Sequence, residues 1–419
     1  MGYNIAIIGS GIAGLSAAWL LGRRHQITLY ERKPEYGLGS DGHPMDPRGA
    51  FRMDLPPRVT NRFHYPNLFR LLDDANLETY EVAQKPSFSR LDGSMYLGFF
   101  EAFVGRRSFS LPKASGAVGP WIKAHGLELG KFYKLLRMPI PSQAGEFSFG
   151  PYLEQLGFSE DFRVGFVYPI CSLICTCPFE MVEAYPADDL LLVLKNFTGS
   201  VVSRRFTGGT RAVESKLKEY VGKVYFNRNV VEVTSEQDGV TVKDQEERIK
   251  YDHVIVATGA PQAWGLLSQK APEREFLSKI PVTETEMVLH RDERLMPLKT
   301  GDWSPVNYTI DFAHGRSAAT VWMNKLDDLD LGSENLFQTL TPVVEPREEL
   351  VLKRATFERS VVTAQSKKAM REFRQLLGHH QGRRLWFVGA YLPDGVPLLE
   401  NGVASAYWVQ DLITRQVSG

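Results

Sequence analysis

The sequence has few cysteines, no net charge and only one uncharged run long enough to raise the question of a membrane span. Three cysteines in 419 residues exclude a disulfide-stapled scaffold and favour a reducing compartment, so we expect a cytoplasmic protein. Lysine and arginine together number 49, and so do aspartate and glutamate, which leaves no electrostatic reason to expect a nucleic-acid partner. A hydrophobic content of 43% supports a full core, and the length suggests two domains.

The uncharged run covers residues 3–22. Three glycines interrupt it, no basic segment precedes it, and a second strand pattern ending in an acid follows at once. These features exclude a signal peptide or a membrane helix, and no other segment is suited to span a bilayer.

The same residues predict a strand, a glycine turn and a helix that hold a dinucleotide. Residues 3–8 are apolar and β-branched, as in a buried parallel strand, and residues 12–21 have the apolar positions of a packed helix. Gly9 permits the tight turn, Gly11 lets a phosphate approach the backbone, and Gly14 lets the helix pack close to the strand. The N–H groups and dipole of the helix start favour an anion, so we expect the pyrophosphate there.

A second predicted strand, residues 26–30, ends in Glu31. A carboxylate at this point can accept hydrogen bonds from both hydroxyls of a ribose. A glycine triplet alone is weak support, but the order of strand, turn, helix, strand and acid is specific. The sequence therefore predicts a dinucleotide site at the start of the chain.

The cysteines lie close together at Cys171, Cys175 and Cys177, within the apolar run 167–177. Cysteine in such a run behaves as a small buried hydrophobe, which is the interpretation we favour. A redox pair and a metal site are the alternatives, and the metal site lacks a fourth ligand at workable spacing.

Signals typical of a nucleotide-binding domain recur in three parts of the chain. We expect residues 1–65, 205–280 and 380–419 to form this domain, and the insertions 66–204 and 281–379 to form a second one. Further strands expected in the first domain are 224–226, 230–233, 239–242, 252–258 and 384–390, with helices at 211–220 and 401–414, the latter capped by Asn401. The second domain is expected to hold helices at 67–74 and 190–194 and antiparallel strands at 286–290, 318–323 and 350–357. The predicted fold class is α/β, a Rossmann-type domain with an interleaved α+β domain.

Several stretches carry a family resemblance that spans nearly the whole chain. They are GSGIAGLSAAWLL from Gly9, YPNL from Tyr65, EAYPA from Glu183, FTGGT from Phe206, VLHRDERLMP from Val288, VWMN from Val321 and LWFVGA from Leu385. In these the sequence resembles the flavin-containing amine oxidase superfamily. The match is closer to a branch of FAD-dependent oxidoreductases associated with cyclopropane-fatty-acyl-synthase-type lipid methyltransferases. The resemblance implies an FAD-binding domain and an interleaved substrate domain.

The resemblance also implies which residues hold FAD. The pyrophosphate would be held by the opening turn and helix start, at Gly9, Ser10, Gly11, Ala13 and Gly14. Glu31 and Arg32 would take the adenosine ribose, and Val230 would pair its backbone with adenine beside Thr258, at the end of a middle strand. Gly389 and Ala390 would lie along the ribityl phosphate, and Gly402 and Val403 would face the flavin O2 region from a helix start.

The sequence departs from the family pattern at four places. The superfamily usually has a Gly-Gly pair after the acid, where this chain has Gly37-Leu38-Gly39. The branch usually has an Asp-Thr-Gly segment where this chain has Asp54-Leu55-Pro56-Pro57. The superfamily often has an acid after the glycine of the C-terminal strand, where this chain has Ala390. The branch commonly has aromatic and histidine residues beyond that strand, where this chain has residues 392–399. These departures cluster where the flavin ring and the substrate meet, so they leave the reaction more open than the cofactor.

Three residues are candidates for the chemistry. Arg58 is placed to stabilise reduced flavin or a substrate head group, His64 to act as a base near neutral pH, and Tyr391 to line an aromatic wall. The structural alternatives are an ion pair for Arg58 and a helix-capping or packing role for His64.

The leading hypothesis is an FAD-dependent oxidase or desaturase of an apolar, fatty-acyl substrate. An amine or amino-acid oxidase, a redox-neutral flavin isomerase and a non-catalytic FAD-binding accessory subunit are the alternatives. The branch resemblance implies a lipid methyltransferase as a partner. The cluster Arg106-Arg107, with Phe103, Phe109, Trp121 and Lys123, is either an ordinary surface or a peripheral membrane contact.

Overall fold

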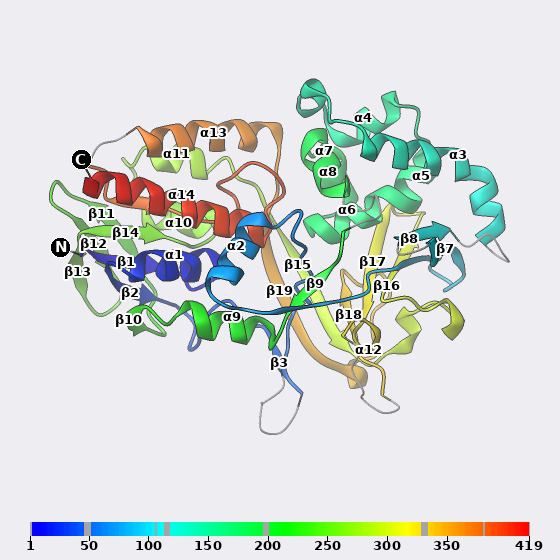
Figure 1. Ribbon diagram of the computed structural model, residues 1–419, viewed down its shortest axis with the longest axis horizontal. Coiled ribbons are helices and arrows are strands. Elements are labelled where there is room, and N and C mark those ends of the chain that lie inside the picture. Colours follow the sequence, from blue (N-terminus) through cyan, green and yellow to red (C-terminus); the bar gives the residue numbers. More distant parts are fainter. Residues whose placement is uncertain are drawn as a thin grey trace.

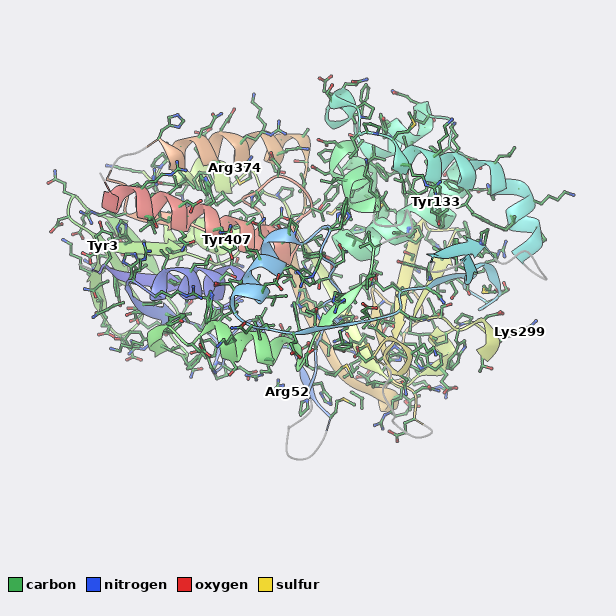
Figure 2. All side chains as sticks on the ribbon, viewed as in Figure 1. Tyr3, Arg52, Tyr133, Lys299, Arg374 and Tyr407 are labelled. Carbon is green, nitrogen blue, oxygen red and sulfur yellow. The ribbon has the colours of Figure 1, made fainter. Side chains whose placement is uncertain are left out.

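A computed structural model describes residues 2–45, 52–104, 107–112, 118–195, 201–327, 334–379 and 382–418. The chain forms two parts that lie side by side (Figure 1). One part holds both ends of the chain and a parallel sheet, and the other holds a large mixed sheet under a layer of helices. In Figure 2, Arg374 and Tyr407 lie on the first part and Tyr133 and Lys299 on the second.

The parallel sheet has five strands drawn from distant parts of the chain. Their order is β10 (Val221–Tyr225), β2 (Gln26–Tyr30), β1 (Asn4–Ile8), β14 (His253–Val256) and β20 (Leu385–Phe387). All neighbouring pairs run parallel. The central strands are apolar because helices or further strands cover both faces of the sheet.

Side chains alternate between the two faces of the central strand β1, as a period of two requires. Ile5 and Ile7 pack with α1 (Ile12–Gly22) and α14 (Leu399–Ser418), the first and last helices of the chain. Ala6 and Ile8 belong to the core on the opposite face. That face is covered by α10 (Ala260–Leu266), α11 (Glu273–Leu277), α13 (Ala364–Gly378) and the antiparallel strands β11 (Glu232–Ser235), β12 (Val240–Lys243) and β13 (Arg248–Tyr251).

The second sheet has eight strands, all paired antiparallel except β16 with β6. Its order is β19 (Val351–Ser360), β15 (Val282–His290), β18 (Phe337–Leu340), β17 (Arg316–Trp322), β16 (Val306–Asp311), β6 (Pro86–Arg90), β7 (Met95–Val104) and β8 (Arg107–Pro112). The covering helices are α3 (Val118–Arg137), α4 (Phe149–Gln155), α5 (Glu160–Phe162), α6 (Tyr168–Cys175), α7 (Phe179–Ala184) and α8 (Ala187–Leu194). Together they bury one large aromatic and apolar core.

Seven short elements complete the described fold. They are β3 (His43–Pro44), β4 (Arg52–Met53), α2 (Pro66–Asp74), β5 (Thr79–Glu81), β9 (Arg204–Phe206), α9 (Gly209–Leu217) and α12 (Met323–Leu326). The predicted helix at 67–74 corresponds to α2. Its first turn is fixed by Glu400 of α14, which accepts hydrogen bonds from the main-chain N–H groups of Asn67 and Leu68.

The predicted fold class is confirmed, with corrections to individual elements. Val230 is not in a strand, because β11 begins at Glu232. Asn401 is not an N-cap, because α14 begins at Leu399, and the Asn401 amide instead donates to the Asp394 carbonyl at 3.0 Å. Helix α13 belongs by sequence to segment 281–379 but packs on the parallel sheet, where Phe373 contacts Phe387. The domain boundaries stay a prediction.

Burial tests two further predictions. Cys171, Cys175 and Cys177 are all buried and unbridged, as expected for packing residues. Trp121 is 7% exposed and packs among aromatic rings of the helical core, so the expectation that it lies on a surface, ordinary or membrane-facing, is wrong for this residue. Arg106 of that cluster lies outside the described residues. No helix in the described part of the chain is both long and apolar enough to cross a membrane.

Candidate cofactor and active site

A cavity of about 320 Å³ opens at the carboxyl ends of β1, β2 and β14. This edge is where open α/β sheets bind their ligands. Seven residues predicted to bind the cofactor line it: Gly9, Ser10, Gly11, Glu31, Arg32, Val230 and Thr258. The structure therefore brings together predicted residues from three separate parts of the sequence.

The three glycines of the opening turn have three different geometric roles. Gly9 has a φ of +104°, a conformation that side chains disfavour, and its N–H donates to the Tyr30 carbonyl at 2.8 Å. A Cβ on Gly14 would lie 2.0 Å from the Gly9 carbonyl oxygen, so only glycine lets α1 start this close to β1. A Cβ on Gly11 would meet nothing within 4 Å, because this residue faces the cavity.

The acid at the end of β2 is held in place by its neighbours. The Glu31 carboxylate accepts hydrogen bonds from the N–H of Ser10 at 3.0 Å and the N–H of Lys33 at 2.9 Å, and also from the Ser10 hydroxyl. The Ser10 hydroxyl oxygen in turn accepts the N–H of Gly37 at 2.7 Å. Both contacts from Ser10 go to Oε2, whereas Oε1 accepts only the Lys33 N–H, so Oε1 can still receive a ribose hydroxyl.

The far wall of the cavity includes residues that sequence reasoning missed. Arg228 follows the parallel strand β10, and its N–H donates to the Glu31 carbonyl at 3.0 Å. Gln262 of α10 donates to the Glu358 carboxylate of β19 at 3.2 Å. No sequence motif pointed to Glu358, because only the tertiary fold brings β19 to this edge.

The C-terminal residues predicted to contact FAD do not line this cavity. The Gly389 N–H donates to the Ser405 hydroxyl at 3.0 Å, which itself donates to the Gly402 carbonyl at 2.7 Å. A Cβ on Gly402 would lie 3.1 Å from Ile12 and 3.5 Å from Ala13, so these residues form the contact between α14 and α1. Val403 is fully buried and Ala390 is half-buried. Cofactor contacts of this group stay a prediction.

Tyr391 lies directly over Gly389, where a Cβ would approach its ring to 2.5 Å. Its hydroxyl is buried and has no hydrogen-bond partner among the described residues. Burial raises the pKa of the phenol, so Tyr391 keeps its proton at neutral pH. The ring also lines a small cavity with Ser360 and Val361, at the end of β19. Its hydroxyl can donate a hydrogen bond, and its place in an aromatic wall stays a prediction.

Arg58 and His64 follow the departing segment Asp54–Pro57 but have different surroundings. Arg58 has a φ of +41°, which is unusual for a residue with a side chain, and its Nε is buried without a partner. The N–H of His64 donates to the side chain of Asn61 at 2.8 Å, and its ring meets the Phe63 ring edge-on at 4.7 Å. His64 therefore belongs to the turn before α2, and its catalytic role stays a prediction.

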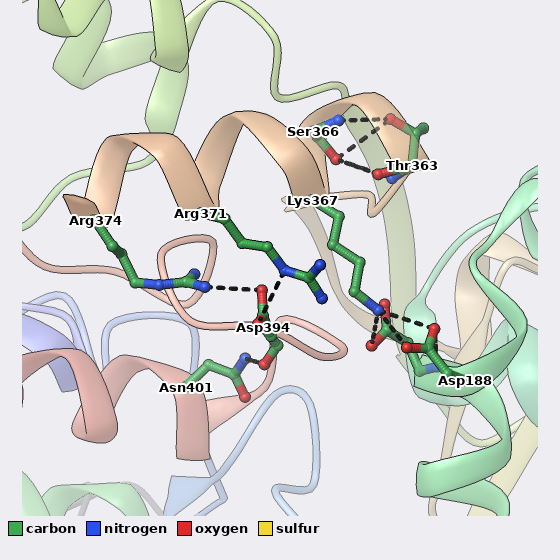
Figure 3. Close-up of polar contacts among 9 residues, drawn as sticks. Asp188, Thr363, Ser366, Lys367, Arg371, Arg374, Asp394 and Asn401 are labelled. Atoms are coloured by element: carbon green, nitrogen blue, oxygen red, sulfur yellow. Dashed lines mark hydrogen bonds and ion pairs between the residues drawn. The ribbon is translucent and has the colours of Figure 1, made fainter. Parts of the chain in front are cut away.

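The departing segments are firmly held. The Asp54 carboxylate accepts hydrogen bonds from the N–H and the hydroxyl of Thr210, and so ties the segment to the start of α9. In the segment after Tyr391, the Asp394 carboxylate receives Arg374 at 2.9 Å and Arg371 at 3.4 Å, both from α13 (Figure 3). Both segments that depart from the family pattern are therefore held in place by contacts with neighbouring helices.

Figure 3 also shows an ion-pair cluster that links α13 to α8, across the two parts of the molecule. The Lys367 ammonium lies 2.7 Å from the Asp188 carboxylate and 2.9 Å from that of Asp189. Burial raises the pKa of Asp189 to about 6, although Lys367 opposes the shift.

The cavity fits FAD on several independent features. The open face of Gly11 lies at a helix start suited to a diphosphate, and Glu31 suits a ribose. The main-chain groups of Val230 have no hydrogen-bond partner among the described residues, as an edge that pairs with adenine requires. Bound FAD supplies a two-electron acceptor, while the protein positions it and tunes its charge. The start of α14 favours negative charge nearby.

The fold and site define a dinucleotide-binding flavoenzyme, and comparisons with known proteins agree. Residues 12–289 match the family model for flavin containing amine oxidoreductases, so the chain belongs to that family. It is an FAD-dependent oxidoreductase of this family.

Three solved structures show the same fold over nearly their whole length. Cyclohexylamine oxidase from Brevibacterium oxydans IH-35A has a TM-score of 0.67 at 12% identity, covering 100% of each chain. Wild-type putrescine oxidase bound to putrescine has a TM-score of 0.65 at 12% identity, covering 99% of each chain. A fatty acid isomerase from P. acnes has a TM-score of 0.63 at 16% identity, covering 98% of each chain.

Proposed function

We propose that this flavin-dependent oxidoreductase acts as an oxidase or a desaturase on an apolar, fatty-acyl substrate. The observation that supports this choice is the charge next to the departing segments. Arg58 and Arg359 are two arginines without an ion-pair partner among the described residues. Their positive charge repels a protonated amine, which disfavours the amine oxidase alternative.

The surroundings of Tyr391 give further support. Leu392 and Val396 are buried apolar residues in the segment that replaces the family's aromatic and histidine residues. Burial keeps the Tyr391 phenol neutral. The Asp394 carboxylate, which lines the same small cavity, is already paired with Arg371 and Arg374, so neither group is suited to hold an ammonium group. The similarity to a fatty acid isomerase adds that one protein with this fold acts on a fatty acid.

Flavin reduction tests this function. FAD-loaded protein is mixed without oxygen with an acyl lipid extract, an alkyl amine or an amino acid, and the visible flavin absorbance is followed. We expect bleaching with the acyl lipids alone. Bleaching by the amine or the amino acid overturns the substrate class, and colourless protein that cannot be reconstituted with FAD overturns the whole proposal.

Product analysis separates the remaining alternatives. Conversion of a lipid without oxygen consumption or lasting bleaching indicates a redox-neutral isomerase. Tight FAD binding without reduction by any compound, together with copurification of a lipid methyltransferase, indicates an accessory subunit. The methyltransferase partner and peripheral membrane contact are predictions that copurification and vesicle sedimentation test.

A further inference from the structure

Two arginines from distant segments carry guanidinium groups that no acid in the described part of the chain neutralises. Arg58 follows Pro57 after β4, and Arg359 is the penultimate residue of β19. The Nε atom of each is buried and lacks a hydrogen-bond partner, and neither residue forms an ion pair within the described residues. Each residue as a whole is half-buried. A cation that is largely removed from water and has no ion-pair partner is unfavourable, so such a pair indicates a missing anion.

The two charges are close enough to influence each other. Burial is the main cause that lowers the pKa of Arg359 to about 10, and the positive charge of Arg58 lowers it further. Burial likewise lowers the pKa of Arg58. Two like charges held together in a desolvated place are destabilised together, and one bound anion relieves both.

The nearest acids are already bound to other groups. The negative charge of Asp54 raises the pKa of Arg58, but the Asp54 carboxylate already accepts two hydrogen bonds from Thr210. Asp41 acts on both arginines, but its carboxylate lies 3.3 Å from the Lys33 ammonium. Within the described ranges the pair is therefore left without an ion-pair partner.

The position of the pair separates it from the diphosphate site. Glu358 lines the nucleotide cavity and Ser360 the small cavity with Tyr391, whereas Arg359, between them in β19, points to the opposite face of the strand. Burial raises the pKa of Tyr65, the residue before α2, and the positive charges of Arg58 and Arg359 both oppose that shift. Both arginines therefore lie near Tyr65, close to the start of α14. The diphosphate has its own site at the glycine turn on β1, so the arginines are left for a second anion.

We propose that Arg58 and Arg359 bind the carboxylate of the substrate, so that the enzyme takes a free long-chain acid rather than an ester, an alcohol or an amine. The planar fork of a guanidinium matches a carboxylate in two parallel hydrogen bonds. The inference rests on the proposed function for the hydrocarbon chain of the substrate, while the negative charge of its head group follows from the arginines alone.

Binding is tested with the FAD-loaded protein by equilibrium dialysis without oxygen. The probes are dodecanoate, dodecanol and dodecylamine, which share a chain and differ in charge. We expect dodecanoate to bind on the order of 10- to 100-fold more tightly than dodecanol, and dodecylamine to bind weakest. Equal binding of acid and alcohol in the unaltered protein overturns the proposal, and this test needs no variant.

Variants then locate the site. Arg359→Met should lose the preference for the acid while leaving dodecanol binding unchanged, and Arg359→Lys should retain part of it because the charge remains. Arg62→Met is the matched control, since Arg62 is exposed and pairs with Asp73 at 2.8 Å. A full preference for the acid in Arg359→Met contradicts the assignment.

Bound FAD, measured by its absorbance after denaturation, distinguishes the other source of negative charge. Loss of FAD from Arg359→Met, with the Arg62→Met control still loaded, assigns the arginines to the cofactor and overturns the inference. Tight dodecanoate binding without flavin reduction by any acyl compound supports the carboxylate site and contradicts the proposed function. Flavin reduction by an acyl ester, with no preference for the free acid, supports the proposed function and contradicts the carboxylate site.

Discussion

The ion-pair cluster between α8 and α13 makes a quantitative prediction about pH. Lys367 supplies one positive charge to two carboxylates, and the Asp189 side chain is only 6% exposed, against 31% for that of Asp188. One oxygen of Asp189 is buried without a hydrogen-bond partner. Asp189→Asn removes the charge but keeps the shape, and so tests whether ionised Asp189 opposes folding.

The magnitude follows from the pKa of Asp189. Burial raises it to about 6 from the usual 3.8, and one pKa unit corresponds to about 1.4 kcal/mol. Because the folded-state pKa lies above the unfolded value, the folded state holds the proton more tightly. Stability therefore falls as pH rises from about 4 to about 6, by about 3 kcal/mol in total. The fall is complete above pH 6.

The assay is urea unfolding of the parent protein and the variant between pH 4 and 8. We expect Asp189→Asn to match the parent near pH 4 and to exceed its free energy of unfolding by about 1–3 kcal/mol at pH 7. Asp188→Asn is the control, because the more exposed carboxylate should give a change below about 1 kcal/mol. A variant that is less stable than the parent at pH 7, or that keeps the same pH slope, refutes the reasoning.

Three further predictions follow from the described contacts. Gly14→Ala should lose bound FAD and lower the Tm, because its Cβ meets the Gly9 carbonyl, whereas Gly11→Ala should fold normally yet hold FAD more weakly; equal FAD content in both contradicts this. Glu31→Gln should weaken FAD binding on the order of 10-fold by calorimetry, and unchanged affinity would count against the ribose assignment. Burial lowers the pKa of His290 to about 4, below its unfolded value, so stability should fall by about 3 kcal/mol as pH drops from 6.5 toward 4. Unfolding of His290→Gln should lack that fall.

The part of the site that could be predicted from sequence is the part made by local structure. Gly9, Gly11 and Gly14 all lie in one turn and helix start, where Gly14 packs on the Gly9 carbonyl, and Glu31 ends the next strand, so their spacing carried the information. The parallel strands were also predictable, because burial on both faces leaves continuous apolar runs.

The remainder depends on contacts between distant segments, which spacing does not encode. Arg359 looked like an ordinary residue in a strand until β19 placed it near Arg58, about 300 residues earlier in the chain. Asn401 has the chemistry of a helix cap, but α14 starts two residues before it and its amide binds the Asp394 carbonyl. In both cases tertiary packing determined the role.

The order of strands in the parallel sheet has a consequence for how the protein is made. The central strand β1 begins at Asn4, while the edge strand β20 and the helix that packs on α1 come from residues 385–418. During synthesis the first strand and helix leave the ribosome with one apolar face still uncovered, and closing this sheet requires contacts of very long sequence separation. We expect a nascent chain arrested before residue 385 to be bound by chaperones and to take up FAD poorly, even though it already contains the whole glycine turn.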